Sequence, residues 1–225
     1  MELWTKETPL YPNVILSLNE LFHLRYLLQT ATCKRQAAMR VITFDIETIG
    51  DFGRGGWKPE NLELTICCTH DSATDSYDSF LKEDLARLWK LLEQADMLVG
   101  YNSDHFDIPI LNKYYPGDLT KIKSLDLMKE VYDVIGRRIK LDTLAAGTLG
   151  AKKSADGTQA MKWWKEGNIK KLREYCIKDV ELTRKLFEHA LEKGVLHYRE
   201  LGSKKEVKLD TSRWMSANTA NETTH

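Results

Sequence analysis

Val41-Ile-Thr-Phe-Asp45-Ile-Glu47-Thr-Ile-Gly50 is the stretch of this sequence that decides the fold. Its apolar residues predict a buried β-strand over residues 41–47, followed by a loop rich in Gly and Asp at 50–60. Side chains alternate between the two faces of a strand, so Asp45 and Glu47 point to the same side. Two buried anions are costly unless a cation compensates them, and hard divalent metals prefer oxygen ligands. The stretch therefore predicts a metal site, with an edge strand carrying two exposed acids as the alternative.

The acidic pair is weak evidence when taken alone. With 33 Asp+Glu in 225 residues, about five acid-x-acid pairs are expected by chance in a chain of this acidity. Most such pairs lie on the solvated surface. The metal interpretation therefore depends on whether further carboxylates converge on the same place.

The overall charge is zero, which gives no indication of a globally basic nucleic-acid binder, and the length suits one domain with a substantial core. The zero conceals an asymmetry. Residues 39–120 carry 7 Lys+Arg against 15 Asp+Glu, whereas residues 121–205 carry 20 against 12. An acidic half beside a basic half fits a metal centre next to a surface for a polyanion. Ordinary helices laced with ion pairs fit it equally well.

The cysteines and the apolar runs indicate a reduced, cytoplasmic protein without membrane association. No CxxC pair and no zinc-like spacing occurs among Cys33, Cys67, Cys68 and Cys176. No apolar run reaches transmembrane length, and the stretch 14–28 lacks the charged start and cleavage pattern of a signal peptide.

Periodicity predicts an α/β chain with early strands, followed by interleaved and then trailing helices. We expect strands at 41–47, 63–69, 76–80, 97–100, 195–199 and 206–210, and helices at 83–95, from 107, and at 126–135, 141–149, 159–166 and 169–193. Asn168 is the expected cap of the last helix. Residues 1–38 are interpreted as an N-terminal extension, either an added helix or a stretch upstream of a start at Met39. Residues 39–212 form the expected domain, and residues 213–225 a flexible tail.

Two further acidic motifs stand at places where α/β proteins carry function. Asn102-Ser-Asp-His-Phe106-Asp107 follows the strand at 97–100, at the end of the sheet where such folds place their active sites. Asp107 can also be read as an ordinary helix cap. Tyr175-Cys-Ile-Lys-Asp179 lies on the long helix, where positions i and i+4 share a face. Asp179 falls within the apolar stripe of that helix, so its charge needs a partner.

In this order, the motifs Phe-Asp45-Ile-Glu47-Thr, Asn102-x3-Phe-Asp107 and Tyr175-x3-Asp179 resemble the DEDD (DnaQ-like) 3′-5′ exonucleases of the ribonuclease-H-like fold. The resemblance covers residues 40–210 and looks closest to the proofreading exonuclease of family B DNA polymerases and its stand-alone bacterial relatives. It implies a central mixed β-sheet flanked by helices. A sister subclass carries a histidine five residues before its last aspartate, where this chain has Glu174, so the tyrosine subclass is favoured. Further matching segments are Lys140-Leu-Asp-Thr143, Leu149-Gly150, Lys152-Lys153, Trp164-x2-Gly167 and Asp179-Val-Glu-Leu-Thr183.

The resemblance implies two divalent cations, Mg²⁺ or Mn²⁺, that grip the scissile phosphate. By analogy, Asp45 bridges both ions, and Glu47 and Asp179 complete the site of the metal that carries the attacking water. Asp107 holds the second metal, and Tyr175 orients the water. These five are the expected catalytic residues.

Substrate contacts are expected around the same motifs. Aromatic stacking and lysine contacts can hold a single strand without reading its sequence. Trp163 and Trp164 are stacking candidates, although adjacent tryptophans on a helix are more often partly core. The expected substrate-binding residues are Thr48, Ile49, Asn102, Phe106, Lys152 and Lys153.

The leading hypothesis is a 3′-5′ exonuclease that releases nucleoside 5′-monophosphates from single-stranded or 3′-ended DNA. An exoribonuclease is the nearest rival, because metal-binding motifs do not read the sugar. A nucleic-acid-binding module that has lost catalysis and a structure-selective endonuclease of the same fold are the others. The presence of all five residues favours an enzyme, and the intact Tyr-x3-Asp motif favours the exonuclease.

Overall fold

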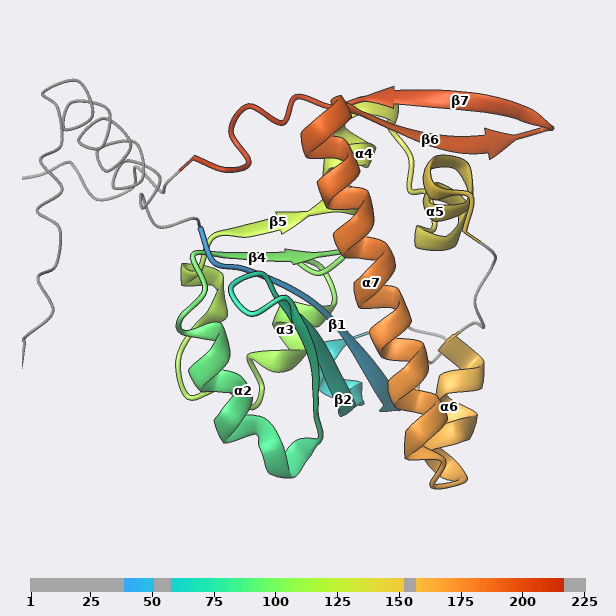
Figure 1. Ribbon diagram of the computed structural model, residues 1–225. Coiled ribbons are helices and arrows are strands. Elements are labelled where there is room, and N and C mark those ends of the chain that lie inside the picture. The colour runs from blue at the N-terminus through green and yellow to red at the C-terminus, as the bar shows by residue number, and fades with distance from the viewer. Residues whose placement is uncertain (1–38, 51–57, 152–156, 217–225) are drawn as a thin grey trace, which may run out of the picture. The chain divides into compact units, whose positions relative to one another are not determined.

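The strand with the two acids, β1 (Val41–Gly50), is the middle strand of a five-stranded sheet (Figure 1). The computed structural model describes residues 39–50, 58–151 and 157–216. The strand order is β3-β2-β1-β4-β5, and β1 pairs antiparallel with β2 but parallel with β4. The predicted central mixed sheet is confirmed. The remaining bounds are β2 (Leu62–Asp71), β3 (Ser76–Phe80), β4 (Met97–Gly100) and β5 (Ser124–Asp126).

The two faces of the sheet are covered by different helices. Ile42, Phe44 and Ile46 of β1 pack in the hydrophobic layer shared with α2 (Leu85–Leu92) and α3 (Asp107–Leu111). Val41 points the other way, into the layer shared with α7 (Ile169–Lys193). Because Asp45 and Glu47 share the face of Val41, the alternation of β1 directs both acids toward α7.

Helix α7 lies across β1 and β2 and holds one side of the site (Figure 1). Its predicted bounds, 169–193, are confirmed, and the Asn168 side chain accepts a hydrogen bond from the amide of Lys171 at 3.2 Å. The helix ends at Gly194, which adopts the left-handed conformation (φ 66°) that glycine tolerates best. The Cys176 thiol donates to the carbonyl oxygen of Asp45 over 3.5 Å, which ties the helix to the strand behind the acids.

A β-hairpin of β6 (Val195–Glu200) and β7 (Ser203–Lys208) forms a second sheet that packs on α5 (Leu141–Leu149). A side chain at Gly147 would overlap the backbone of His197, so the helix can lie this close only because that position is glycine. The Thr148 hydroxyl also donates to the carbonyl of His197 (3.0 Å) and accepts from its amide (2.8 Å). The hairpin is therefore fixed to α5 by backbone contact.

The other helices complete the two layers. Helix α4 (Leu127–Ile135) follows β5, and α6 (Gly157–Lys165) packs beside α7. Three short 3₁₀ helices connect the larger elements: Pro59–Asn61, Lys82–Asp84 and Leu119–Lys121.

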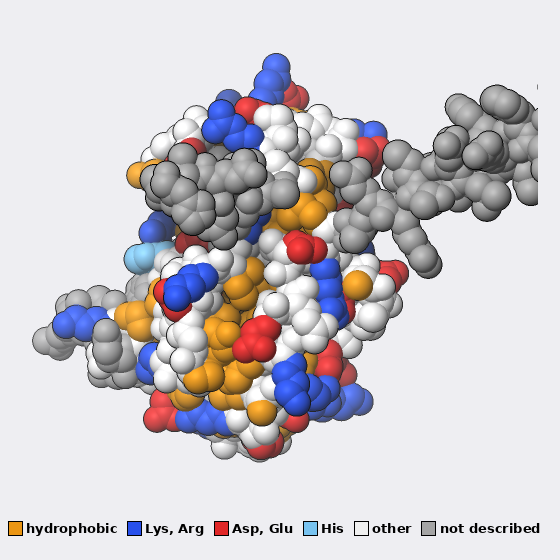
Figure 2. All heavy atoms as spheres, turned by 90° about the vertical axis from the view of Figure 1, so that its left-hand side faces the viewer, with side chains coloured by type: hydrophobic (Ala, Val, Ile, Leu, Met, Phe, Trp, Pro, Cys, Tyr) orange, Lys and Arg blue, Asp and Glu red, His pale blue; other side chains and the backbone are white. Residues whose placement is uncertain are grey.

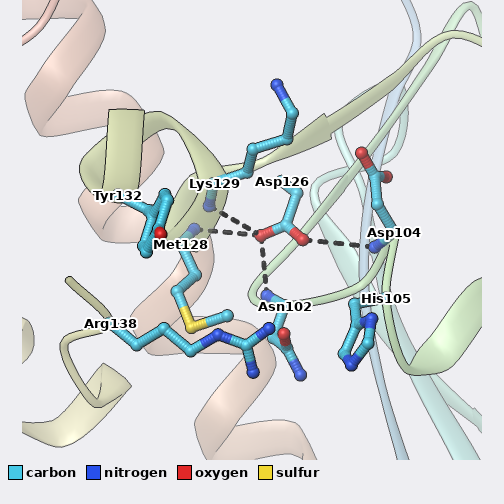
Figure 3. Close-up of a pocket in the computed structure, with 8 residues that line it drawn as sticks. All are labelled: Asn102, Asp104, His105, Asp126, Met128, Lys129, Tyr132 and Arg138. Atoms are coloured by element: carbon cyan, nitrogen blue, oxygen red, sulfur yellow. Dashed lines mark hydrogen bonds between the residues drawn. The ribbon is translucent and has the colours of Figure 1, made fainter. Parts of the chain in front are cut away.

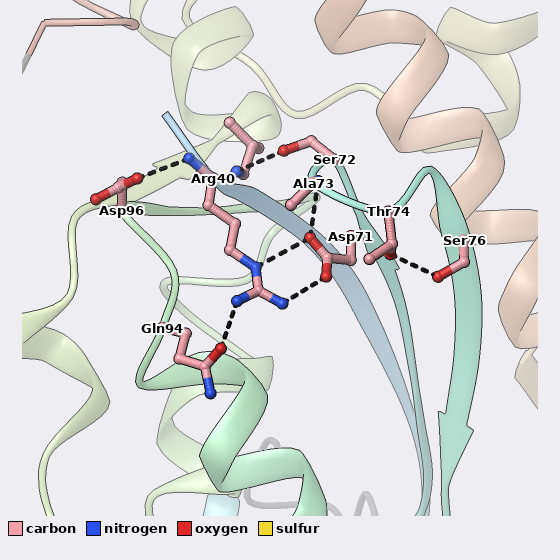
Figure 4. A network of polar contacts seen from close by, with 9 residues as sticks. Arg40, Asp71, Ser72, Ala73, Thr74, Ser76, Gln94 and Asp96 are labelled. Carbon is pink, nitrogen blue, oxygen red and sulfur yellow. Dashed lines mark hydrogen bonds and ion pairs between the residues drawn. The ribbon is translucent and has the colours of Figure 1, made fainter. Parts of the chain in front are cut away.

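A polar network anchors the start of β1 (Figure 4). Arg40 donates to both carboxylate oxygens of Asp71, at 3.1 and 2.6 Å, and to the side-chain oxygen of Gln94 at 2.5 Å. Its backbone amide donates to Asp96 at 2.7 Å. The hydrogen bond from Arg40 lowers the pKa of Asp71 below its usual value. The network joins the start of β1 to the end of β2 and to the segment between α2 and β4.

The structure differs from the sequence-based expectations at a few elements. Strand β5, three residues long, was not predicted, and the helix expected at 83–95 is divided into a 3₁₀ turn and the shorter α2. The packed chain extends to Trp214, which is buried and stacks on Phe187 with ring centroids 5.7 Å apart. Expectations for residues 1–38, 51–57, 152–156 and 217–225 lie outside the described residues, and the division into extension, domain and tail stays a prediction.

None of the helices in the described ranges combines the length and the apolar character that a membrane-spanning helix needs.

Candidate metal centre

Three carboxylates from two elements meet at one point. Asp45 and Glu47 on β1 and Asp179 on α7 each offer an oxygen, and these oxygens lie within 4.8 Å of one another. The strand places its two acids on one face, and the helix that crosses this face supplies the third. All three side chains are half-buried. An all-oxygen set of this kind matches the preference of hard divalent cations.

Asp107 lies beside this trio as the first residue of α3, with only 4% of its surface exposed. One of its carboxylate oxygens accepts a hydrogen bond from the backbone amide of Ile46 at 3.1 Å, so it is held against β1 between the two strand acids. Its charge raises the pKa of both Asp45 and Glu47. The structure therefore brings all four predicted carboxylates into one electrostatic cluster.

The cluster resists being fully ionised. Burial first, and then the charges of Asp107 and Asp179, raise the pKa of Asp45 well above its usual value. Glu47 has a pKa raised by burial and then by the same two aspartates. Burial and the neighbouring Asp142 raise the pKa of Asp179 to about 7, and burial raises that of Asp107 to about 7. Carboxylates in this state need compensating positive charge to ionise at neutral pH.

A divalent cation fits an unmet bonding need at this point. The Oδ1 atom of Asp179 is buried and has no hydrogen-bond partner among the described residues. Leaving a buried polar atom unpaired costs about 1–3 kcal/mol, and more when it is charged. A cation shared with Asp45 and Glu47 would satisfy it. The residues present therefore fit the divalent metal that the sequence implies.

Tyr175 lies one helical turn before Asp179 on α7, close enough for its phenol and that carboxylate to interact electrostatically. The ring packs edge-on against Trp163, with centroids 6.0 Å apart. Burial raises the pKa of the Tyr175 phenol, so it stays protonated and remains a donor. The structure thus brings together all five predicted catalytic residues.

The predicted substrate contacts are placed less uniformly. Thr48 is buried, with 7% of its surface exposed, and Ile49 is half-buried after it on β1. Phe106 is half-buried and packs against the layer that contains α2. Lys152 and Lys153 lie outside the described residues.

Asn102 adopts the left-handed backbone conformation, with φ 65°. Its side-chain oxygen is buried and has no hydrogen-bond partner in the described part of the chain. A strained residue with an unpaired acceptor next to the Asp107 helix remains a good candidate for a substrate contact. Trp163 and Trp164 are partly buried and pack against the buried cluster around Cys176. This confirms the interpretation that they are partly core.

Asp126, which sequence reasoning missed, organises the loop that leads to Asp107. Its carboxylate accepts hydrogen bonds from the amides of Asn102 (2.7 Å) and Asp104 (3.2 Å), and from those of Met128 and Lys129 at the start of α4 (Figure 3). In the sequence, Asp126 stands directly before a predicted helix, which indicates a helix cap. That position does not indicate the hydrogen bonds with the amides of Asn102 and Asp104.

The mixed sheet and the carboxylates gathered beside its central strand agree with what the comparison with protein families finds. Residues 42–191 match the family model described as the RNase_H superfamily. This is more than half of the chain, and the protein belongs to that superfamily. Membership supports a nuclease function, with a nucleic-acid substrate and divalent metals.

Among solved structures, the chain is similar to the family B DNA polymerase from the hyperthermophilic archaeon Pyrobaculum calidifontis, with a TM-score of 0.53 and 20% identity. The match covers 68% of this chain and 24% of the polymerase chain, so it spans about a quarter of that protein. At this identity the likeness shows the fold. A search of curated proteins finds no significant match.

Proposed function

We propose that this protein is a metal-dependent 3′-5′ exonuclease of the tyrosine DEDD subclass, acting on single-stranded DNA. The observation that carries the proposal is the convergence of Asp45, Glu47, Asp107 and Asp179 from three separate elements beside the Tyr175 hydroxyl. The family alone does not require this tyrosine. Its position one helical turn from Asp179, within electrostatic reach of Asp45 and Glu47, supports a role at the reacting phosphate.

Asp45, Glu47, Asp107 and Asp179 would together hold the divalent ions. Bound in this way, the metals supply Lewis acidity, which lowers the pKa of a water and offsets charge on the phosphate. The Tyr175 hydroxyl, beside Asp179, orients the water toward phosphorus. The water adds to phosphorus, the bond to the 3′ oxygen of the preceding nucleotide breaks, and a nucleoside 5′-monophosphate leaves.

Backbone contacts keep the carboxylates in place for this reaction. The thiol of Cys176 donates to the carbonyl of Asp45, and the amide of Ile46 donates to Asp107. Both contacts lie inside the protein, the first partly and the second fully buried. The ligands are thereby pre-positioned by the fold, which limits the reorganisation needed during turnover.

The test is an assay with 5′-labelled single-stranded DNA and RNA in Mg²⁺ or Mn²⁺, with Asp45→Ala as the control. We expect a ladder that shortens from the 3′ end of the DNA and is absent with Asp45→Ala. Equal shortening of the RNA would assign an exoribonuclease as well. Internal cuts in a strand with a blocked 3′ end, or an unchanged rate in Asp45→Ala, would reject the proposal.

Tyr175→Phe separates the orienting hydroxyl from the metal ligands. The variant keeps the ring against Trp163 but loses the hydroxyl beside Asp179. Misplacement of a reacting group costs up to about 100-fold in rate, so we expect slower turnover in this range, with activity above that of Asp45→Ala. Single-turnover rates at saturating metal measure it. A rate equal to that of the unmodified protein would exclude Tyr175 from the reaction.

A further inference from the structure

Two hollows adjoin on the surface near α4 and share Arg138. Figure 3 shows the first, of about 270 Å³, lined by Asn102, Asp104, His105, Asp126, Met128, Lys129, Tyr132 and Arg138. The second, of about 210 Å³, lies between the start of α5 and the hairpin. Its lining consists of Arg137, Arg138, Ile139, Lys140, Thr143, Tyr198, Arg199 and Glu200.

The second hollow carries cations that have no acidic partner. Arg138, Lys140 and Arg199 are exposed and form no ion pair or side-chain hydrogen bond with any described residue. Arg137 is different, because it donates to Glu200 at 2.6 Å and to the hydroxyl of Tyr198 at 3.1 Å. Exposed cations gathered in a hollow without partners favour a polyanion there.

Elsewhere in the basic half of the chain, part of the positive charge is paired with neighbouring acids. On α7, Lys178 and Lys185 both pair with Glu181, and Arg184 pairs with Glu188 at 2.7 Å. The side of the molecule where β1, β4 and β5 begin shows acidic and basic side chains intermixed around apolar ones (Figure 2). Because paired charges cancel, the positive excess of this half comes from cations without an acidic partner, and Arg138, Lys140 and Arg199 are the ones that gather in a hollow.

The acids that line the first hollow are already engaged by the protein. The Asp126 carboxylate accepts backbone amides, and Asp104 accepts the hydroxyl of Ser124 at 2.6 Å. Met128 and Tyr132, the latter 46% exposed, offer an apolar surface beside the guanidinium of Arg138 (Figure 3). An aromatic face next to a cation is the combination that single-stranded nucleic acids use, the base on the ring and the phosphate on the cation.

The first hollow is connected to the metal centre by the chain itself. Asn102 and His105 line it, and the same loop runs into Asp107, one of the four clustered carboxylates. In Figure 3 the guanidinium of Arg138 points toward Asn102, and His105 lies beyond Asn102. A strand whose 3′ end reaches the carboxylates could therefore continue past Asn102 and Arg138 to the hairpin.

We propose that the two hollows form a track for the phosphate backbone of a single-stranded nucleic acid on the 5′ side of the scissile bond. Arg138, Lys140 and Arg199 contact successive phosphates, and Tyr132 with Met128 supports a base. This inference rests on the proposed function and adds a consequence to it. Affinity depends on strand length, because a very short strand occupies the metal centre without reaching Arg199.

The test compares Arg138→Ala/Arg199→Ala with Lys90→Ala/Lys121→Ala in the full chain. The control removes the same number of exposed positive charges, but from α2 and from the 3₁₀ helix at 119–121, outside both hollows. Binding of a 5′-labelled trinucleotide and of a long oligothymidylate is measured by fluorescence anisotropy in EDTA over a salt series. Circular dichroism verifies that each variant is folded.

We expect the track variant to bind the long strand more weakly and to lose about 0.7 in salt slope for each phosphate contact removed. Its binding of the trinucleotide, and the binding of both strands by the control variant, should stay unchanged. Arg138→Lys/Arg199→Lys should restore most of the affinity for the long strand. Equal losses for short and long strands, or equal losses in both variants, would overturn the track.

Turnover separates this inference from the proposed function. With active protein, the track variant should raise KM for the long strand and leave kcat unchanged. Length-dependent binding through Arg138 and Arg199 without any shortening of the strand would retain the track and reject the exonuclease. Shortening of the long strand with an unaltered KM in the track variant would retain the exonuclease and reject the track.

Discussion

Each of the four clustered carboxylates is held where its charged form is disfavoured. The pKa of Asp107 and that of Asp179 are raised to about 7, whereas aspartates in an unfolded chain titrate near about 4. Between these values the folded protein binds more protons than the unfolded chain, so the free energy of unfolding falls as the pH rises. Above about pH 7 the carboxylates are ionised, and the full cost of their charge is subtracted from the free energy of unfolding. Without cations, the site therefore opposes folding under neutral and basic conditions.

This linkage predicts an unusual pH dependence of stability. In EDTA, the melting temperature of the protein should fall between about pH 5 and about pH 8, and Mg²⁺ or Mn²⁺ should restore it at the higher value. Asp45→Asn removes one charge and should raise the melting temperature in EDTA at about pH 8, by about 2–4 °C for each kcal/mol recovered in a chain of this length. Thermal denaturation followed by circular dichroism measures both effects.

Asp133→Asn is the matched control, because Asp133 is an exposed acid on α4 that pairs only with Lys129, at 3.3 Å. It should leave the melting temperature in EDTA nearly unchanged. If Asp45→Asn destabilised the metal-free protein at about pH 8, the electrostatic account of the cluster would be wrong.

At the scale of elements, the loop between β4 and α3 depends on the start of α4. Asp126 caps α4 through the amides of Met128 and Lys129, and it holds the amides of Asn102 and Asp104 with the same carboxylate. One buried side chain thus joins β5, α4 and the loop that presents Asp107.

Asp126→Ala should therefore affect stability and catalysis together. Loss of the cap costs about 2 kcal/mol, with a further cost for the two unanchored loop amides. We expect a lower urea midpoint and slower turnover, because the loop that leads to Asp107 becomes less ordered. Asp133→Ala on the same helix should change neither quantity. An Asp126→Ala protein with a normal urea midpoint and a normal rate would show that the loop needs no anchor.

Sequence predicted best the elements whose apolar pattern repeats over many residues. Helix α7 repeats its apolar spacing over its whole length and is bounded by Asn168 and Gly194, so its predicted limits agree with the structure. The alternation of β1 placed Asp45 and Glu47, and helical spacing placed Tyr175 and Asp179. Strand β5 is too short to show any alternation, which is why it was missed.

Other parts of the site depend on contacts that no local pattern records. The second role of Asp126 arises only when β4 and β5 pair side by side. Arg138 and Arg199 both line the second hollow because the hairpin packs on α5, and sequence spacing carries no sign of this. Sequence thus predicted the carboxylates that the structure brings together, which lie at regular positions on single elements, and missed features assembled from distant ones.

For the molecule as a whole, the Arg40 network defines where the packed chain starts. Asp71 at the end of β2, and Gln94 and Asp96 between α2 and β4, all contact this one residue (Figure 4). The side chain of Arg40 is 25% exposed and that of Asp71 only 8%, so the pair is shielded from solvent more than most surface ion pairs. We propose that the independent domain begins immediately before this network, at Met39.

A fragment of residues 39–216 should therefore unfold cooperatively at the urea midpoint of the full chain and keep its activity. In the full chain, Arg40→Ala should lower the free energy of unfolding by about 1–3 kcal/mol, because the buried Asp71 loses its partner. Lys82→Ala, which breaks an exposed pair with Glu63 at 2.8 Å, should be nearly neutral. A fragment 39–225 that fails to fold would show that residues 1–38 belong to the domain.

The contact at Gly147 fixes the distance between α5 and the hairpin, and a substitution there can change this distance. Because helix α5 touches the backbone of His197 where Gly147 has no side chain, even one added methyl group would push the hairpin outward. Arg199 would move with the hairpin, while Arg138 and the metal centre would stay in place. A single uncharged substitution could therefore lengthen the interval between phosphate contacts without altering any of the contacting groups. Gly147 therefore sets the smallest possible distance between α5 and the hairpin.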